Sequence, residues 1–170
     1  MLYYIFIDLS KLFAKGGTAV LISTKGRYAI RLMIDMAQNQ ADGYLSLKSI
    51  ADRQNISMKY LESIAGALSS KGLIKSTRGK LGGYRLADEP KNLNVGDILA
   101  VSQGGINTVE CSGGKNCSCE KDCLAMPLWA GLDKVVNDFF HGLSLQDLLN
   151  SEEKDIYLIR KDKDDESIRR

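Results

Sequence analysis

The sequence predicts a mostly helical fold in which two short helices and a basic two-stranded hairpin precede one long amphipathic helix. Three observations support this prediction. Apolar residues recur at helical spacing through 23–38, 47–54 and 58–70. Segments 73–76 and 83–86 have the pattern of paired strands around a glycine-rich basic turn. A wide apolar stripe then runs through 128–141, which predicts the long helix.

Composition limits the class of protein. The chain has 170 residues, a net charge of +2, 44% apolar residues and 26% charged residues, which is typical of one globular domain with a possible appendage. An enzyme is not expected. No histidine lies near the cysteines, and the sequence shows no catalytic nucleophile–base pair. The glycine-rich segment 78–83 lacks the strand-to-helix context of a phosphate-binding loop.

Residues 1–20 are expected to be a non-native or disordered extension. The apolar run that starts at Met1 is interrupted by Asp8, far short of the roughly 20 residues that a membrane span needs. The segment also lacks the basic start and small-residue cleavage site of a signal peptide. Lys15–Gly17 is compatible with purine-rich codons resembling a ribosome-binding site, and Val20 or Leu21 with alternative start codons. We therefore expect no membrane partner.

The first helix, 23–38, is apolar on most sides and is predicted to be a buried core helix, with Ser23 or Thr24 as its N-cap. Lys25, Arg27 and Arg31 cluster at its start. Cations at a helix N-terminus oppose the macrodipole, so an external anion would compensate them. Lys25 and Arg27 are therefore candidate DNA contacts, and a solvated turn is the alternative.

Two short helices follow, 47–54 and 58–70, with Ser46 and Ser57 as caps and a tight turn at Asn55–Ile56. This arrangement matches a helix-turn-helix. The second helix of such a motif reads base edges, while its caps and backbone amides contact phosphates. The expected DNA contacts on this helix are Ser57, Lys59, Tyr60, Glu62 and Ser63.

The hairpin strengthens the DNA-binding interpretation. Residues 71–85 contain five basic side chains and no acidic one. A helix-turn-helix followed at once by a basic hairpin is a winged helix, here assigned to 21–101. Arg78 and Lys80 lie in its turn, where Arg78 would enter the minor groove or bind phosphate of double-stranded DNA. A solvated hairpin is the alternative.

The remaining helices are predicted at 94–101, at 128–141 after Pro127 in a first turn, and at 143–150 with Ser144 as cap. The apolar stripe of 128–141 is too wide for a winged-helix core alone. We expect 127–150 to form dimerisation helices in a homodimer, which suits a pseudo-palindromic operator. His141, the only histidine, is expected to cap its helix rather than ligate a metal, and 151–170 to be a charged disordered tail.

Between these parts, 102–126 is a cysteine loop. All four cysteines lie within the thirteen residues from Cys111 to Cys123, with Cys111, Cys117 and Cys123 spaced C-x5-C-x5-C and Cys119 between the last two. A disulfide framework would spread its cysteines across the chain. The clustering favours a metal or cluster site in a reducing compartment, with a redox disulfide or idle thiols as alternatives.

These segments together resemble a bacterial family of winged-helix regulators that includes the iron–sulfur cluster regulator IscR, the nitric-oxide sensor NsrR and the cysteine-metabolism repressor CymR. The matching segments are STKGRYAIRLMIDMA, ISMKYLESI, STRGKLGGYRLA, the cysteine loop and the Leu128–Trp129 pair. The resemblance covers 21–150.

The resemblance implies a cytoplasmic, homodimeric transcription regulator whose DNA binding follows the state of an iron–sulfur cluster. Cys111, Cys117 and Cys123 would be the ligands, a set that the CymR type lacks. Glu62 matches an acidic residue that discriminates operator classes, and Arg78 matches the wing arginine. Iron–sulfur assembly genes are the expected targets, with cysteine metabolism second.

The resemblance leaves the fourth ligand open. IscR-like members place a histidine where this chain has Met126, and NsrR-like members use an aspartate where it has Arg27. Cys119 is the candidate replacement, with Glu110, Glu120 or an exogenous ligand as the other candidates. A [2Fe–2S] cluster is favoured over [4Fe–4S]. The alternative is a winged-helix repressor of cysteine metabolism with a four-thiolate structural zinc or a thiol–disulfide switch.

Overall fold

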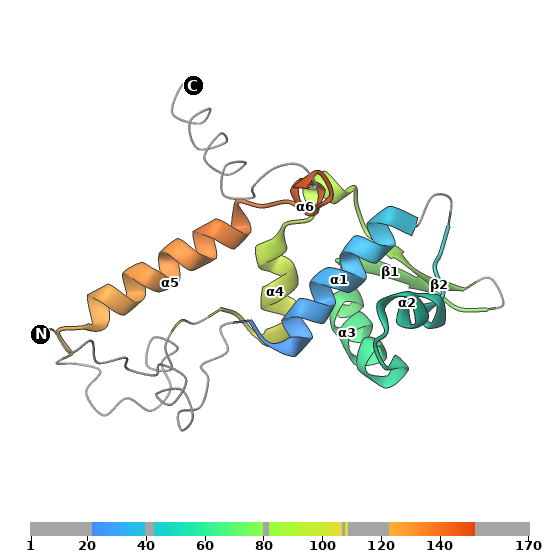
Figure 1. The fold of residues 1–170 in the computed structure, drawn as a ribbon, viewed down its shortest axis with the longest axis horizontal. Coiled ribbons are helices and arrows are strands. Elements are labelled where there is room, and N and C mark those ends of the chain that lie inside the picture. The colour runs from blue at the N-terminus through green and yellow to red at the C-terminus, as the bar shows by residue number, and fades with distance from the viewer. Residues whose placement is uncertain (1–21, 40–42, 80–81, 107, 109–122, 152–170) are drawn as a thin grey trace, which may run out of the picture.

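The computed structural model describes residues 22–39, 43–79, 82–106, 108 and 123–151. Figure 1 shows helices and a small hairpin gathered around α1, with α5 extending away from that body. The elements are α1 (Thr24–Asn39), α2 (Leu47–Gln54), α3 (Met58–Ser70), β1 (Ile74–Thr77), β2 (Gly83–Leu86), the 3-10 helix η2 (Pro90–Asn92), α4 (Val95–Gln103), α5 (Met126–His141) and α6 (Leu145–Leu149).

Helix α1 is the centre of the core, as the sequence predicts. It packs against α2, α3, α4, β2 and α6. Its apolar residues meet those of α2, α3 and the wing in one cluster whose fully buried members include Leu32, Met36, Ile64 and Leu68. Ser23 caps the helix, because its Oγ accepts a hydrogen bond from the Gly26 amide at 3.0 Å.

Helices α2 and α3 have the predicted bounds. Ser46 caps α2 by accepting a hydrogen bond from the Ser49 amide. Asn55 ends α2 in the left-handed conformation at φ 51, which asparagine tolerates better than most residues. Ile56 is buried immediately after it and anchors the turn in the core. The helix-turn-helix therefore rests on one cap, one left-handed residue and one buried side chain.

The wing is antiparallel, with Ile74 paired to Leu86 and Thr77 to Gly83. Its first strand begins at Ile74 and includes Thr77, so the predicted strand 73–76 was wrong by one residue. The reason is that the Leu73 amide donates to the Leu68 carbonyl at 3.0 Å and belongs to the turn that ends α3.

The later helices also differ from prediction at their ends. Helix α4 runs to Gln103 instead of 101 and is closed by Gly104 in the left-handed conformation. Helix α6 is shorter than the predicted 143–150. Ser144 caps it in a capping box, as predicted, while the carbonyl of buried Leu143 accepts a hydrogen bond from Val95 and stays outside the helix. Leu145 is fully buried in the main core.

Helix α5 begins at Met126, two residues before the predicted 128, with Pro127 in its first turn as expected. Only its C-terminal part packs on the body. Val136, Phe139 and Phe140 join a second apolar cluster that includes Leu99 and Leu143. No residue of α5 is fully buried, so the part of the chain that the structure describes leaves much of this helix uncovered.

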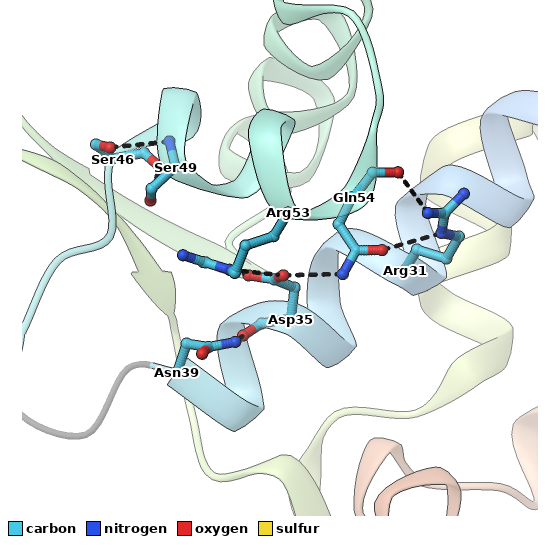
Figure 2. Close-up of polar contacts among 7 residues, drawn as sticks. All are labelled: Arg31, Asp35, Asn39, Ser46, Ser49, Arg53 and Gln54. Carbon is cyan, nitrogen blue, oxygen red and sulfur yellow. Dashed lines mark hydrogen bonds and ion pairs between the residues drawn. The ribbon is translucent and has the colours of Figure 1, made fainter.

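An ion pair between buried Asp35 and exposed Arg53 fixes α2 on α1. Asp35, 1% exposed, accepts hydrogen bonds from Arg53 Nε at 3.1 Å, from Arg53 Nη2 at 2.5 Å and from Gln54 Nε2 at 2.8 Å. Gln54 in turn accepts two hydrogen bonds from Arg31, one on its side-chain oxygen at 3.0 Å and one on its carbonyl. Figure 2 shows Arg53 and Gln54 converging on Asp35 from α2. Two side chains of α1, Asp35 and Arg31, therefore hold the last turn of α2.

The charge of Asp35 is stabilised despite its burial. Burial raises the pKa of the Asp35 carboxyl, but the hydrogen bonds from Arg53 and Gln54 and the charge of the Arg53 guanidinium outweigh it. The net result is a pKa below the ordinary value for aspartate. This ion pair therefore contributes stability wherever Asp35 is ionised in the folded protein.

Several predictions fall outside the described residues: the extension 1–20, Lys80, Cys111, Cys117, Cys119 and nearly all of the tail 151–170. Among the residues that the structure does describe, no helix is long and apolar enough to cross a membrane.

We expect Asp35→Asn to lower the free energy of unfolding at pH 7 by about 2 kcal/mol, because it removes the charge-assisted hydrogen bonds that Arg53 and Gln54 donate to the buried carboxylate. Urea denaturation measures this change. Asp52→Asn is the matched control, since Asp52 is exposed on α2 and should change stability by less than about 0.5 kcal/mol.

The pH dependence gives a second readout for the same pair of variants. Because folding lowers the pKa of Asp35, its contribution to stability is fully present above the pKa of aspartate in the unfolded chain, about 3.9. This contribution is lost as pH falls through the lower pKa that Asp35 has in the folded protein. Stability should therefore fall less steeply below about pH 4 in Asp35→Asn than in the wild type. Parallel curves for the two proteins would contradict the stabilising role of this ion pair.

Candidate functional site

The outer face of α3 is polar and open. Ser57, Lys59, Glu62 and Ser63 are exposed, while Leu61, Ile64, Ala65 and Leu68 turn into the core. The Ser57 hydroxyl makes no capping hydrogen bond, so it and the first amides of α3 are available to an external acceptor. Four of the five predicted contacts on this helix therefore share one exposed surface at its N-terminal half.

Tyr60, the fifth, is placed differently. It is half-buried, and its ring packs edge-on against Tyr28 with 5.6 Å between ring centroids. The Arg31 guanidinium lies 5.5 Å from the Tyr28 ring centroid. Tyr60 therefore joins α3 to α1, a positioning role that the sequence reasoning did not anticipate. Its contact with DNA stays a prediction.

The wing presents its basic residues outward. Lys75, Arg78 and Arg85 are exposed, and Arg85 lies 5.0 Å above the Tyr44 ring centroid. The wing is also tied to the segment before α2, because Leu45 and Tyr84 exchange two backbone hydrogen bonds of 2.8 Å. Sequence reasoning missed this third strand-like contact, which keeps the wing and the helix-turn-helix in one rigid unit.

Gly83 makes that contact possible. A Cβ atom at this position would lie 2.3 Å from the Leu45 carbonyl oxygen, which is far closer than any real side chain approaches a backbone oxygen. The close approach of the two backbones therefore requires glycine.

The basic residues at the start of α1 lie elsewhere. Arg27 is exposed, and its Nη2 donates to Thr24 Oγ1 at 3.2 Å. Together with Arg31 it also lines an apolar cavity between α1, α4, α5 and α6. Lys25 is half-buried. The predicted DNA contacts of Lys25 and Arg27 stay untested.

Both ends of the cysteine loop are attached to α5. The Thr108 amide donates to Asp133 Oδ1 at 2.6 Å, and the Ile106 carbonyl accepts a hydrogen bond from Asn137 Nδ2 at 3.0 Å. At the other end, half-buried Cys123 leads directly into α5, and its carbonyl accepts a hydrogen bond from Met126 at 3.1 Å. One helix therefore fixes where the loop leaves and where it returns.

The other loop cysteines fall outside the described residues. Within the residues described, no three His, Cys, Asp or Glu side chains come together as metal ligands. The donor chemistry of Cys123 is nevertheless suitable. A thiolate just before α5 lies near the positive end of the helix macrodipole, which favours negative charge. Met126, at the position where a histidine ligand was expected, is the first residue of that helix.

His141 has the role that the sequence predicts. Its Nδ1 donates to the Asn137 carbonyl at 2.9 Å in the last turn of α5, and its Nε2 lies 3.7 Å from Asp97 Oδ1. The length of α5 separates it from Cys123 by roughly 25 Å at the helical rise per residue. It caps the helix and joins α5 to α4.

The sequence matches the profile of the Rrf2 family, described as an iron-dependent transcriptional regulator, over residues 22–151. The chain belongs to the Rrf2 family. Its relatives include the HTH-type transcriptional regulator IscR of Pectobacterium carotovorum, which is 34% identical over 149 residues covering 88% of this chain and 89% of that protein. IscR of Aliivibrio salmonicida is 35% identical over 128 residues, covering 75% of this chain and 76% of that protein.

Solved structures agree. The chain is similar to CymR, the global cysteine regulator of B. subtilis, with a TM-score of 0.65 and 37% identity over 78% of this chain and 98% of CymR. It is also similar to T. potens IscR, with a TM-score of 0.63 and 36% identity over 81% of this chain and 92% of IscR. This Rrf2 protein is thus a DNA-binding transcription regulator with a winged-helix fold, and not an enzyme.

Two glycine substitutions should have opposite effects on the free energy of unfolding. Gly83→Ala should destabilise by about 1–3 kcal/mol, because the new methyl group collides with the Leu45 backbone. Gly66→Ala should stabilise by about 0.5–1 kcal/mol, because Gly66 is exposed in α3 with open space around it. Thermal or urea unfolding measures both. Equal effects would show that the wing does not depend on the close approach at Leu45.

Proposed function

We propose that this Rrf2 protein is a homodimeric transcription regulator that senses the state of an iron–sulfur cluster held by its cysteine loop, and that it controls iron–sulfur assembly genes. One observation carries the proposal. Helix α5 holds both ends of the cysteine loop, and the C-terminal part of the same helix packs against the DNA-binding body. A change in the loop therefore acts on α5, a helix that also contacts the DNA-binding body.

On DNA, the exposed face of α3 lies in the major groove and its N-terminal amides meet phosphate. Lys59, Glu62 and Ser63 read base edges, and Ser57 contacts the backbone. Arg78 and Lys80 extend from the wing to phosphate or the minor groove. The exposure of the four α3 side chains and of Arg78 supports this assignment.

The homodimer is supported by the uncovered face of α5. Leu128, Leu132 and Val135 are 64%, 43% and 67% exposed, and their spacing is that of a helix–helix seam. Exposed apolar residues in a contiguous row mark an interaction surface. Pairing two copies through this row gives the protein a twofold axis, which suits a pseudo-palindromic operator.

The cluster would be held by Cys111, Cys117 and Cys123, with Cys119 as the fourth thiolate. Four thiolates are the common ligand set of iron–sulfur clusters, with [2Fe–2S] our first assignment and [4Fe–4S] the second. When bound, the cluster together with its thiolate ligands would carry a net charge that changes on oxidation or iron loss. Binding orders the loop between its two attachments on α5, and it shifts the protein between conformations only by its differential affinity for them.

A second candidate is a repressor of cysteine metabolism in which the four thiolates hold a structural zinc or form a switchable disulfide. The similarity to CymR favours the role in cysteine metabolism and does not bear on the thiolate site. Tetrahedral four-thiolate sites are typical of structural zinc. Anaerobically purified protein would then be colourless and contain zinc instead of iron and sulfide. A disulfide switch would instead appear as a two-proton mass loss after diamide treatment.

For the DNA interface, Arg78→Ala should weaken operator binding about tenfold and lower the slope of log affinity against log salt by about 1, because one phosphate contact is lost. Fluorescence anisotropy at several salt concentrations measures both. Lys91→Ala is the control, since Lys91 is exposed on η2 and pairs with Glu89. If both variants keep the wild-type slope, Arg78 does not touch phosphate.

For the cluster, Cys117→Ala should abolish visible absorbance and bound iron in anaerobically purified protein and should alter promoter choice in footprints. Ser118→Ala, its neighbour without a thiol, should leave both unchanged. Wild-type protein that contains zinc and no iron would support the second candidate. Unchanged iron and unchanged footprints in Cys117→Ala would contradict the sensing role of the loop.

A further inference from the structure

Met58 is an exposed apolar side chain at the start of α3 that the proposed DNA contacts do not include. Five large apolar side chains are exposed among the described residues, and four of them lie on α5 or in the turn before it. Met58, the fifth, is 38% exposed at the first position of α3. Neither apolar cluster in the described part of the chain includes it. These clusters therefore do not account for a methionine at this position.

Met58 and Glu62 lie on the same side of α3, one turn apart. Residues at positions i and i+4 are neighbours on a helix surface, and both of these side chains are exposed. The side chains of a helix tilt toward its N-terminus. Met58 is therefore directed toward the end of α3 where the Ser57 hydroxyl makes no capping hydrogen bond. In helix-turn-helix proteins, the residues at this end of the second helix contact base edges.

The chemistry of a methionine side chain limits what it can read on DNA. Its thioether is a weak hydrogen-bond acceptor with no donor, and its three rotatable bonds let it adapt to the shape of an apolar partner. Base edges in the major groove display hydrogen-bonding groups and one apolar group, the 5-methyl group of thymine. Met58 therefore fits a thymine, whereas the Glu62 carboxylate suits the N4 amino group of cytosine, which donates a hydrogen bond.

We propose that Met58 contacts the 5-methyl group of one thymine in each half-site of the operator, close to the base that Glu62 reads. The inference rests on the proposed position of α3 in the major groove and adds a base preference to it. One helical turn rises about 5.4 Å, and successive bases lie about 3.4 Å apart along the duplex. The thymine therefore lies within about two base pairs of the position that Glu62 specifies. The contact favours thymine over cytosine there, because cytosine lacks the methyl group.

The test uses the full-length protein and an operator duplex selected from random DNA with that protein. Each thymine is replaced in turn by deoxyuridine, which lacks only the 5-methyl group, and the dissociation constant is measured by fluorescence anisotropy at fixed salt. Replacing one particular thymine in a half-site should weaken binding about fourfold, the effect expected for one methyl group removed from an apolar contact. Wild-type binding that no deoxyuridine replacement weakens would overturn the proposal.

Variants of Met58 show whether that methyl group touches this side chain. Met58→Ala should bind the thymine and deoxyuridine duplexes equally, and Met58→Leu should again prefer thymine by about two- to fourfold. Lys59→Ala is the matched control, since Lys59 is the exposed neighbour on α3. It should weaken binding to both duplexes alike and keep the fourfold ratio. A fourfold ratio that persists in Met58→Ala would assign the effect to another side chain or to DNA shape, and the proposal would be wrong.

The position of the sensitive thymine separates this inference from the proposed DNA interface. Operator selection with Glu62→Ala should relax the base preference at one position of each half-site, and the sensitive thymine should lie within about two base pairs of it. A sensitive thymine farther away would reject the contact with Met58 and leave the interface intact. If Lys59→Ala and Glu62→Ala both bind the selected operator as the wild type does, the proposed interface itself fails.

Discussion

The carboxylate of Asp35 is the constraint on which the DNA-reading part of this protein depends. It lies inside α1, among residues that are otherwise apolar, and it accepts hydrogen bonds from Arg53 and Gln54 in the last turn of α2. Removing Arg53 would leave the buried Asp35 carboxylate desolvated and without its charged partner, which is strongly destabilising. The orientation of α2 is therefore strongly determined. Asn55 and Ile56 then set where α3 begins.

A second constraint acts at the other end of the molecule. Helix α5 is attached to the body through Val136, Phe139 and Phe140, and to the start of the cysteine loop through Asp133 and Asn137. The described residues leave Leu128, Leu132 and Val135 in its N-terminal part exposed. A helix that packs on the body and also holds both ends of a ligand loop can transmit a change in that loop to its packing partners. The proposed sensing role uses this arrangement.

The two constraints meet at α1. One face of this helix holds α2 through Asp35 and Arg31, and its N-terminal turns border the cavity next to Phe139 and Phe140. The fold thus brings the attachment of α5 and the attachment of the helix-turn-helix onto one rigid element. That placement, rather than any single contact, is what makes regulation of DNA binding by the loop physically reasonable.

Local signals predicted the elements that local chemistry determines. Ser46 and the turn at Asn55 defined α2 correctly, because caps and turn residues act within a few positions. Ser57 marked the start of α3 correctly, although its hydroxyl makes no capping hydrogen bond. The ends of α4 and α6 were missed, since buried contacts override such signals. Asp35 was overlooked, although a lone acid in an apolar helix calls for a basic partner. The Leu45–Tyr84 contact and the packing of Tyr60 on Tyr28 depend on long-range placement, which sequence spacing does not encode.

The most direct test of the account is amide hydrogen exchange in two forms of the protein, one reconstituted anaerobically with iron and sulfide and one stripped by a chelator. The account predicts that loading changes exchange in the turn between α2 and α3, around residues 53–57, as well as in the loop. Identical exchange in that turn, with iron and sulfide bound in the loaded form, would contradict the coupling between the cysteine loop and the DNA-reading helix.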